Sequence, residues 1–113
     1  MRALVISHST ADHLGGAERS LLSILAAWRD ARPDLELLVV GPAEAAMHAA
    51  LGEAGVPARV VPMSGWTVVD DDGGAAQRRL RAQQNAAATK ALLAIVDEVE
   101  PHLVVTNTLV LPW

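Results

Sequence analysis

Two adjacent glycines, Gly15 and Gly16, are the residues of this sequence best placed to bind a ligand. They follow a polar loop and precede a pattern in which Leu21, Leu25 and Trp28 recur at helical spacing. Two glycines let the backbone of a helix start approach a ligand closely, and the unpaired N–H groups of a first helical turn attract anions. The pair therefore indicates either a phosphate or diphosphate site or a tight turn, and the pair alone does not decide between them.

The rest of the sequence narrows the choice of phosphate ligand. The dinucleotide fingerprint G-x-G-x-x-G and the P-loop G-x-x-x-x-G-K-[ST] are both absent. NAD binding and P-loop phosphoryl transfer are therefore disfavoured.

Polar residues beside the glycines are weaker candidates for the site. His8 ends the first apolar run and His13 lies just before Gly15, so each is either an ordinary loop residue or a substrate contact. Glu18 falls in the first helical turn, where the helix dipole favours a carboxylate, so it is either a structural residue or a substrate contact. The sequence has no Cys, and no third His or carboxylate falls at a spacing that would complete a metal site. We expect neither a metal nor a cofactor.

The composition is that of an apolar, mildly acidic chain. Of its 113 residues 51% are hydrophobic and 19% are charged, so the chain can bury a core and is long enough for one domain, residues 1–113. The net charge of −4 argues against a nucleic-acid or membrane-surface partner. The acidic run 70–72 and the basic run 78–81 are expected to be solvated faces. The short apolar start is typical of a strand rather than a signal peptide, and we expect a cytoplasmic location.

Short β-branched runs alternate with helical patterns along the chain. Strands are expected at residues 3–7, 35–40, 58–63 and 103–106, and helices at 17–32, 43–54 and 75–99. Solid apolar strands that are each followed by a helix indicate a parallel sheet covered on both faces. The predicted fold class is α/β: a Rossmann-like, doubly wound parallel sheet in three α/β/α layers with strand order 3-2-1-4.

The residues after the fourth strand indicate a truncated sheet. Leu109, Val110, Leu111 and Trp113 follow that strand with no helix to cover them, so we expect the domain to be incomplete. The alternative is an apolar tail that packs on the edge of the sheet.

Ligands of doubly wound sheets bind beyond the carboxyl ends of the strands, where the strand order reverses. That rule selects the loops 7–16 and 106–112.

The segment LGGAERSLL, residues 14–22, resembles the amino-terminal GGAER signature of the family 4 retaining glycosyltransferases, which have the two-domain GT-B fold. The strand end VISH, residues 5–8, and the segment EPHLVVTN, residues 100–107, resemble the same domain. The resemblance follows the order of elements over the whole chain, but its specific motif is short.

The resemblance implies a function for each candidate residue. Gly15 and Gly16 would contact the diphosphate of the nucleotide-sugar donor, and the rest of the domain would shape the site of the sugar, lipid or small-molecule acceptor. His8, His13, Glu18, Asn107 and Thr108 are the weaker acceptor-site candidates. Several relatives carry a His where this sequence has Asn107, which can bind a sugar hydroxyl but cannot act as a base. We therefore expect no catalytic residue within these 113 residues.

The nucleotide-binding domain of such an enzyme would lie beyond Trp113, so the 113-residue chain is expected to be inactive alone and to self-associate through its uncovered sheet. A peripheral membrane position for the full-length enzyme stays open. Two rival functions also stay open: a stand-alone α/β binding or dimerisation module, and half of a nucleotide-sugar epimerase.

Overall fold

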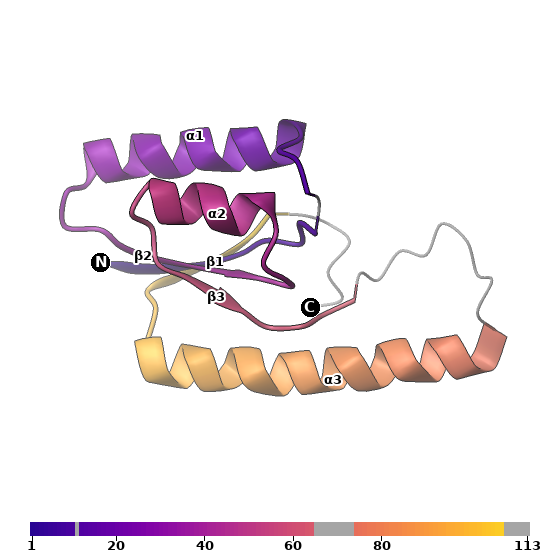
Figure 1. Ribbon diagram of the computed structural model, residues 1–113. Helices are drawn as coiled ribbons and strands as arrows, with labels where there is room; N and C mark the ends of the chain where they lie inside the picture. The colour runs from indigo at the N-terminus through magenta and orange to yellow at the C-terminus, as the bar shows by residue number, and fades with distance from the viewer. Residues whose placement is uncertain (11, 65–73, 108–113) are drawn as a thin grey trace.

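The computed structural model describes residues 1–10, 12–64 and 74–107 of the chain. Its elements, in chain order, are β1 (Arg2–Ile6), α1 (Gly16–Ala31), β2 (Glu36–Gly41), α2 (Ala46–Glu53), β3 (Ala58–Val60), α3 (Gly74–Val99) and β4 (Leu103–Thr106). Helices α1 and α2 cover one face of the sheet and α3 covers the other (Figure 1). The three-layer α/β arrangement confirms the predicted fold class.

The four strands form one parallel sheet in the order β3-β2-β1-β4, as predicted. Strand β1 is central, because Leu4 aligns with Leu38 of β2 on one side and with Val104 of β4 on the other. The carboxyl ends of the strands share one edge of the sheet, at the right of Figure 1.

The core has two layers because successive strand residues face opposite sides of the sheet. Ala3 and Val5 of β1 pack toward α1 and α2, while Leu4 and Ile6 pack toward α3. The solid apolar runs of β1 and β2 supply both layers at once. The helical residues buried in these layers are Leu21, Leu25, Met47, Leu51, Ala88, Leu92 and Ile95.

Most element boundaries agree with the prediction to within one residue, and two do not. Helix α1 ends at Ala31, two residues before Pro33, and Gly55 after α2 has a φ of +70°, the left-handed conformation expected of a glycine at this position. Strand β3, however, ends at Val60 instead of Met63. Pro62 explains the difference, since it has no N–H to give to a neighbouring strand. Helix α2 begins at Ala46 instead of residue 43, and no contact explains that shift.

Helix α3 is longer than the sheet that it covers. Its 26 residues span about 39 Å, and its buried residues, from Ala88 onward, all lie in its second half. The first half extends beyond the carboxyl edge of the sheet, with Leu80 59% exposed (Figure 1). Leu92 is 5% exposed in the core on this side of the sheet, whereas its neighbour Leu93 is 59% exposed.

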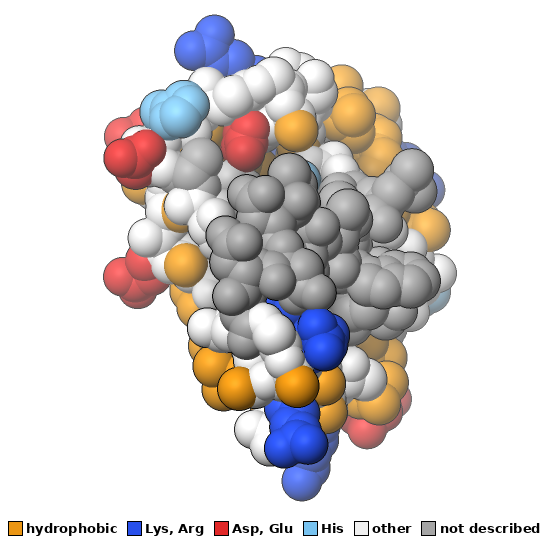
Figure 2. Space-filling model, turned by 90° about the vertical axis from the view of Figure 1, so that its right-hand side faces the viewer, with side chains coloured by type: hydrophobic (Ala, Val, Ile, Leu, Met, Phe, Trp, Pro, Cys, Tyr) orange, Lys and Arg blue, Asp and Glu red, His pale blue; other side chains and the backbone are white. Residues whose placement is uncertain are grey.

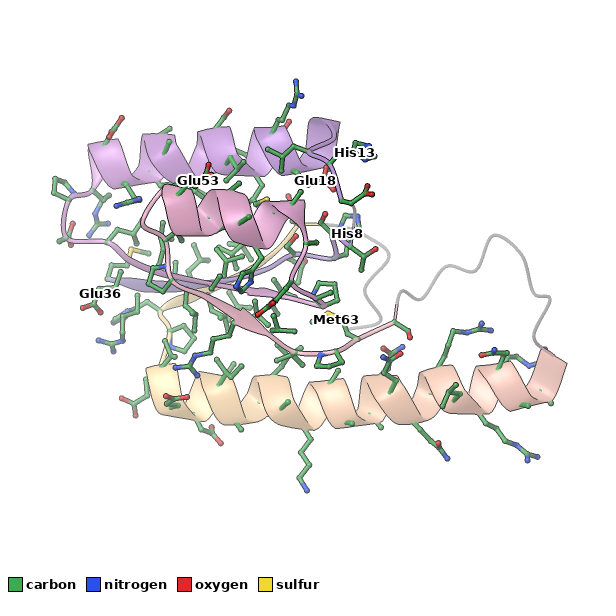
Figure 3. The ribbon with its side chains drawn as sticks, in the orientation of Figure 1. His8, His13, Glu18, Glu36, Glu53 and Met63 are labelled. Carbon is green, nitrogen blue, oxygen red and sulfur yellow. The ribbon has the colours of Figure 1, made fainter. Side chains whose placement is uncertain are left out.

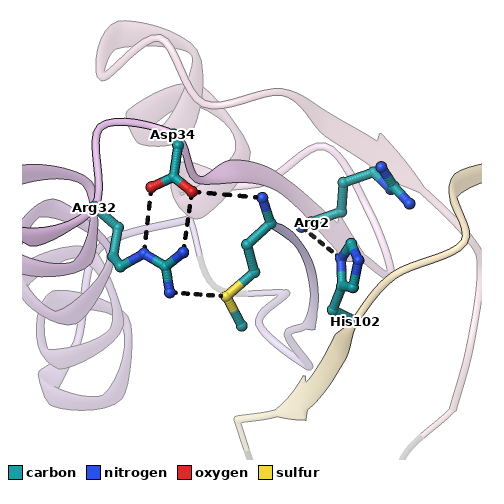
Figure 4. Close-up of polar contacts among 5 residues, drawn as sticks. Arg2, Arg32, Asp34 and His102 are labelled. Carbon is teal, nitrogen blue, oxygen red and sulfur yellow. Dashed lines mark hydrogen bonds and ion pairs between the residues drawn. The ribbon is translucent and has the colours of Figure 1, made fainter.

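Polar contacts connect elements at the amino edge of the sheet. Arg32, just after α1, forms a two-pronged hydrogen bond with Asp34, whose carboxylate also lies 3.8 Å from the amino terminus of Met1 (Figure 4). The Arg32 hydrogen bond lowers the pKa of Asp34. These groups are exposed, so the contacts fix local geometry more than they add stability.

Candidate functional site

The carboxyl edge of the sheet brings the two predicted loops together. Strand β1 ends at Ile6 and leads into the loop before α1, and β4 ends at Thr106 beside it. The backbone N–H of Asn107 donates a 2.9 Å hydrogen bond to the carbonyl of Ile6. Asn107 therefore lies next to the start of the first loop, as the strand order predicts. Thr108 lies outside the described residues.

Glu18 folds back over the start of α1, and Figure 3 shows it at the same end of the molecule as His8 and His13. Its Oε2 accepts a 3.0 Å hydrogen bond from the N–H of Gly15, the residue that caps the helix. Its Oε1 accepts a 2.8 Å hydrogen bond from the hydroxyl of Ser9. This is half of a capping box, because glycine at the cap has no side chain to return the contact.

The two glycines differ in what surrounds them. A Cβ on Gly15 would stand 2.9 Å from Glu18 Oε2, so the folded-back carboxylate leaves room only for glycine unless it shifts. A Cβ on Gly16 would meet no atom within 4 Å. Neither residue has a positive φ. The fold therefore accounts for Gly15, and it offers no internal reason for Gly16.

The backbone N–H groups at the start of α1 also differ in whether they have a hydrogen-bond acceptor. Arg19 begins the helical ladder by donating to the carbonyl of Gly15 at 3.1 Å, and the N–H of Gly15 is taken by Glu18. Among the described residues, the N–H groups of Gly16 and Ala17 have no backbone acceptor. These two donors, rather than those of Gly15 and Gly16 as expected from the sequence, are the ones open to an anion.

Glu18 remains ionised in this setting. The hydrogen bond from Ser9 lowers its pKa most, and backbone N–H groups and the nearby His8 act in the same direction. Burial of the carboxyl acts in the opposite direction and raises the pKa, but the net change is a lowering. The start of α1 thus already carries a negative charge supplied by the protein.

The two histidines of the first loop have different surroundings. His8 is partly buried, and its Nδ1 is shielded from solvent with no hydrogen-bond partner in the part of the chain that the structure describes. His13 is exposed and lies 3.2 Å from the carboxylate of Asp12. Both histidines lie at the predicted edge.

Sequence reasoning missed Ser9 as a member of the site. Its side chain is only 6% exposed, and its N–H contacts the hydroxyl of Ser7, which is 2% exposed. The signal that could have found it is Glu18 itself, three residues after a helix cap and in need of a donor.

The carboxyl edge forms a surface rather than an enclosed pocket in the described residues. A cavity of about 10 Å³, enough for about one water molecule, lies there between Ser7, Ser9 and Gly41. Larger, open hollows of about 380 and 500 Å³ lie at the amino edge, around Arg29 and Leu35. Figure 2 looks onto the carboxyl edge and shows basic side chains gathered at its lower end, over the beginning of α3. Apart from the small hollow between Ser7, Ser9 and Gly41, the carboxyl edge of the described residues is open to solvent.

Comparison with protein-family models, curated proteins and solved structures finds no match to this chain. The glycosyltransferase resemblance therefore rests on the segments quoted from the sequence. No helix in the described ranges combines the length and apolar character that a membrane span needs. Within the same ranges, no three His, Cys, Asp or Glu side chains gather as metal ligands.

Proposed function

We propose that this chain is the acceptor-side, Rossmann-like domain of a GT-B retaining glycosyltransferase that takes its sugar from a nucleotide-sugar donor. The segment LGGAERSLL supports the proposal, since its glycines start α1 at the carboxyl edge of the sheet, where doubly wound folds bind ligands. Strand order 3-2-1-4 and the proximity of Asn107 to the first loop are consistent with it.

The observation that carries the proposal is Gly16. At the start of α1 glycine costs helix stability relative to alanine, and neither contacts nor backbone conformation require it. A ligand that approaches the backbone closely supplies the missing reason. The open N–H groups of Gly16 and Ala17 are suited to a diphosphate.

In this proposal the remaining candidates contact the acceptor. His8, His13 and Asn107 line the edge beside the diphosphate, and Asn107 offers both a donor and an acceptor to a sugar hydroxyl. Glu18 is already engaged with Ser9 and Gly15. The nucleotide and the catalytic groups belong to a second domain that these 113 residues do not contain, and the proposed location is the cytoplasm.

The test is a titration with inorganic pyrophosphate, followed by the backbone amide resonances. We expect saturable shifts centred on Gly16 and Ala17, and an affinity about tenfold lower in Gly16→Ala, a change of about 1.4 kcal/mol. Gly52→Ala is the matched control, because Gly52 lies in α2 and an added Cβ there also meets nothing within 4 Å. Shifts that avoid Gly16, or equal affinity in Gly16→Ala, contradict the diphosphate site.

A second assay tests whether catalysis needs a second domain. The 113-residue chain, incubated with nucleotide-sugars and simple acceptors, is expected to show neither transfer nor hydrolysis. Turnover by this chain alone would overturn the proposal that catalysis needs another domain.

A second candidate function is a stand-alone dimerisation module, and the surface of β4 favours it. Leu103 and Val104 are 41% and 46% exposed, and no described strand pairs with the outer edge of β4. A stable dimer that does not bind pyrophosphate would support this module and count against the glycosyltransferase.

A further inference from the structure

Glu18 is an anion placed by the protein where the proposed function places the anion of a ligand. Both of its oxygens are used, one by the N–H of Gly15 and the other by the hydroxyl of Ser9. A carboxylate that only balanced the helix dipole would not need the second contact.

The contact to Ser9 connects the helix start to the sheet. The carbonyl of Val40 in β2 accepts a 2.9 Å hydrogen bond from the N–H of Ser7. The hydroxyl of Ser7 accepts one from the N–H of Ser9 at 3.3 Å. Ser9 in turn donates to Glu18, which holds the N–H of Gly15. A continuous series of hydrogen bonds thus runs from the buried sheet to the first glycine.

We infer that Glu18 is a positioning residue for the donor diphosphate, an inference that rests on the proposed function. With Ser9, it fixes the shape of the turn and withholds the N–H of Gly15 from the ligand. The diphosphate is then confined to the N–H groups of Gly16 and Ala17. The negative charge of Glu18 also repels that diphosphate and lowers its affinity. Glu18 therefore fixes the position of the diphosphate but weakens its binding.

The variant Glu18→Gln separates the effect of Glu18 on the shape of the turn from the effect of its negative charge. A glutamine can accept from Gly15 with its amide oxygen and donate to Ser9 with its amide nitrogen, so the shape is kept while the charge is removed. We expect pyrophosphate to bind about fivefold more tightly to Glu18→Gln than to the natural chain, and the difference to shrink in about 1 M salt. A purely structural cap would show no such salt-dependent gain.

The variant Glu18→Ala removes both the hydrogen bonds of Glu18 and its negative charge. The N–H of Gly15 is then free, and pyrophosphate is expected to shift the Gly15 amide as well as those of Gly16 and Ala17. Glu53→Gln is the matched control, because it makes the same change of charge on an exposed residue of α2 and should leave the affinity unchanged. Thermal melts of each variant identify any that do not fold.

A measurement without ligand keeps this inference distinct from the proposed function. The Gly15 amide resonance should follow the titration of the Glu18 carboxyl with a midpoint below 4.5, and should lose that response in Glu18→Gln. The positioning role is overturned if the Gly15 amide resonance does not change with the titration of Glu18. It is also overturned if Glu18→Gln and the natural chain bind pyrophosphate with equal affinity. If the titration is seen but no variant binds pyrophosphate, the proposed function fails, and with it the placement of a diphosphate by Glu18; the hydrogen-bonded turn alone is then supported.

Discussion

The imidazole of His102 accepts a 3.0 Å hydrogen bond through Nδ1 from the backbone N–H of Arg2 (Figure 4). The contact joins the residue before β4 to the first residue of β1, 100 positions earlier in the chain. Because Nδ1 accepts, the ring carries its proton on Nε2. The backbone N–H of His102 donates to the carbonyl of Arg2 at 2.8 Å, so the two residues bond in both directions.

The first prediction concerns this pair. His102→Ala removes the side-chain half of the contact and is expected to lower the free energy of unfolding by about 0.5–1 kcal/mol, the usual net value of one hydrogen bond. Urea unfolding measures the change. His13→Ala is the control, since His13 is exposed and, among the described residues, its hydrogen bond and ion pair are both with Asp12, which is exposed too. This variant should unfold like the natural chain. Equal loss in both variants would contradict the role of His102.

The second prediction separates two neighbouring leucines of α3. Leu92 is 5% exposed in the core layer between the sheet and α3, and Leu93 is 59% exposed. Leu92→Ala leaves a cavity and should cost about 2–4 kcal/mol, whereas Leu93→Ala should change stability by less than about 0.5 kcal/mol. Chemical denaturation of the two variants measures the contrast. Similar losses at both positions would mean that α3 packs on the sheet with a different face.

The third prediction concerns two glycines near the end of α2. Gly55 has a φ of +70°, and an alanine there is strained whatever the free space, so Gly55→Ala should destabilise the protein by about 1 kcal/mol. Gly52 lies within the helix, and Gly52→Ala should stabilise by up to about 1 kcal/mol. Thermal unfolding followed by circular dichroism measures the opposite signs. A gain in both variants would show that the left-handed conformation is not required.

The fourth prediction follows from the lowered pKa of Glu18. A carboxyl group whose pKa is lower in the folded than in the unfolded chain stabilises the fold above its unfolded pKa, and this contribution is lost as the pH falls through the folded pKa. The stability difference between the natural chain and Glu18→Gln should therefore be constant well above the unfolded pKa of a Glu carboxyl, and decline as the pH falls through the lowered pKa of Glu18 in the folded chain. Urea unfolding across this range tests it. A difference that grows on acidification would reverse the sign and exclude the hydrogen bond from Ser9 as its cause.

The fifth prediction concerns self-association through β4. A strand edge without charge that also exposes Leu103 and Val104 favours pairing with another copy. Sedimentation velocity should show dimers that increase with concentration, and Val104→Lys should shift them to monomer. Val60→Lys on β3 is the control, because the neighbouring Arg59 already forms an ion pair with Glu98 and charges that edge. Monomers at every concentration would count against the association.

The sheet could be predicted from the sequence because its strands are solid apolar runs. Each of β1 and β2 supplies four consecutive buried residues, and only a strand covered on both faces needs that pattern. The prediction that β3 ends at Met63 was wrong, although Pro62, which explains the earlier end, is visible in the sequence. The exposure of Leu93 could not be predicted, because helical periodicity gives relative faces but does not say where the sheet beneath a helix ends.

The position of the candidate site could be predicted, but its internal contacts could not. Gly15, Gly16 and Asn107 lie at the expected edge because strand order fixes which loops meet. The hydrogen bond between Ser9 and Glu18 joins two residues nine positions apart, the second of them in the first turn of α1. With glycine at the cap, the sequence lacks the Ser or Thr that identifies a capping box. Nothing in the sequence therefore indicates that the Glu18 carboxylate accepts the N–H of Gly15.

The central position of β1 also affects how the protein is made. A ribosome releases β1 before the other described strands, and β1 can pair with β2 soon afterwards. Its other neighbour, β4, follows about 100 residues later, which at roughly 5–20 residues per second is a delay of at least several seconds. During that interval one edge of the innermost strand has no partner from its own chain. The nascent chain must therefore keep β1 paired on one side only until β4 emerges.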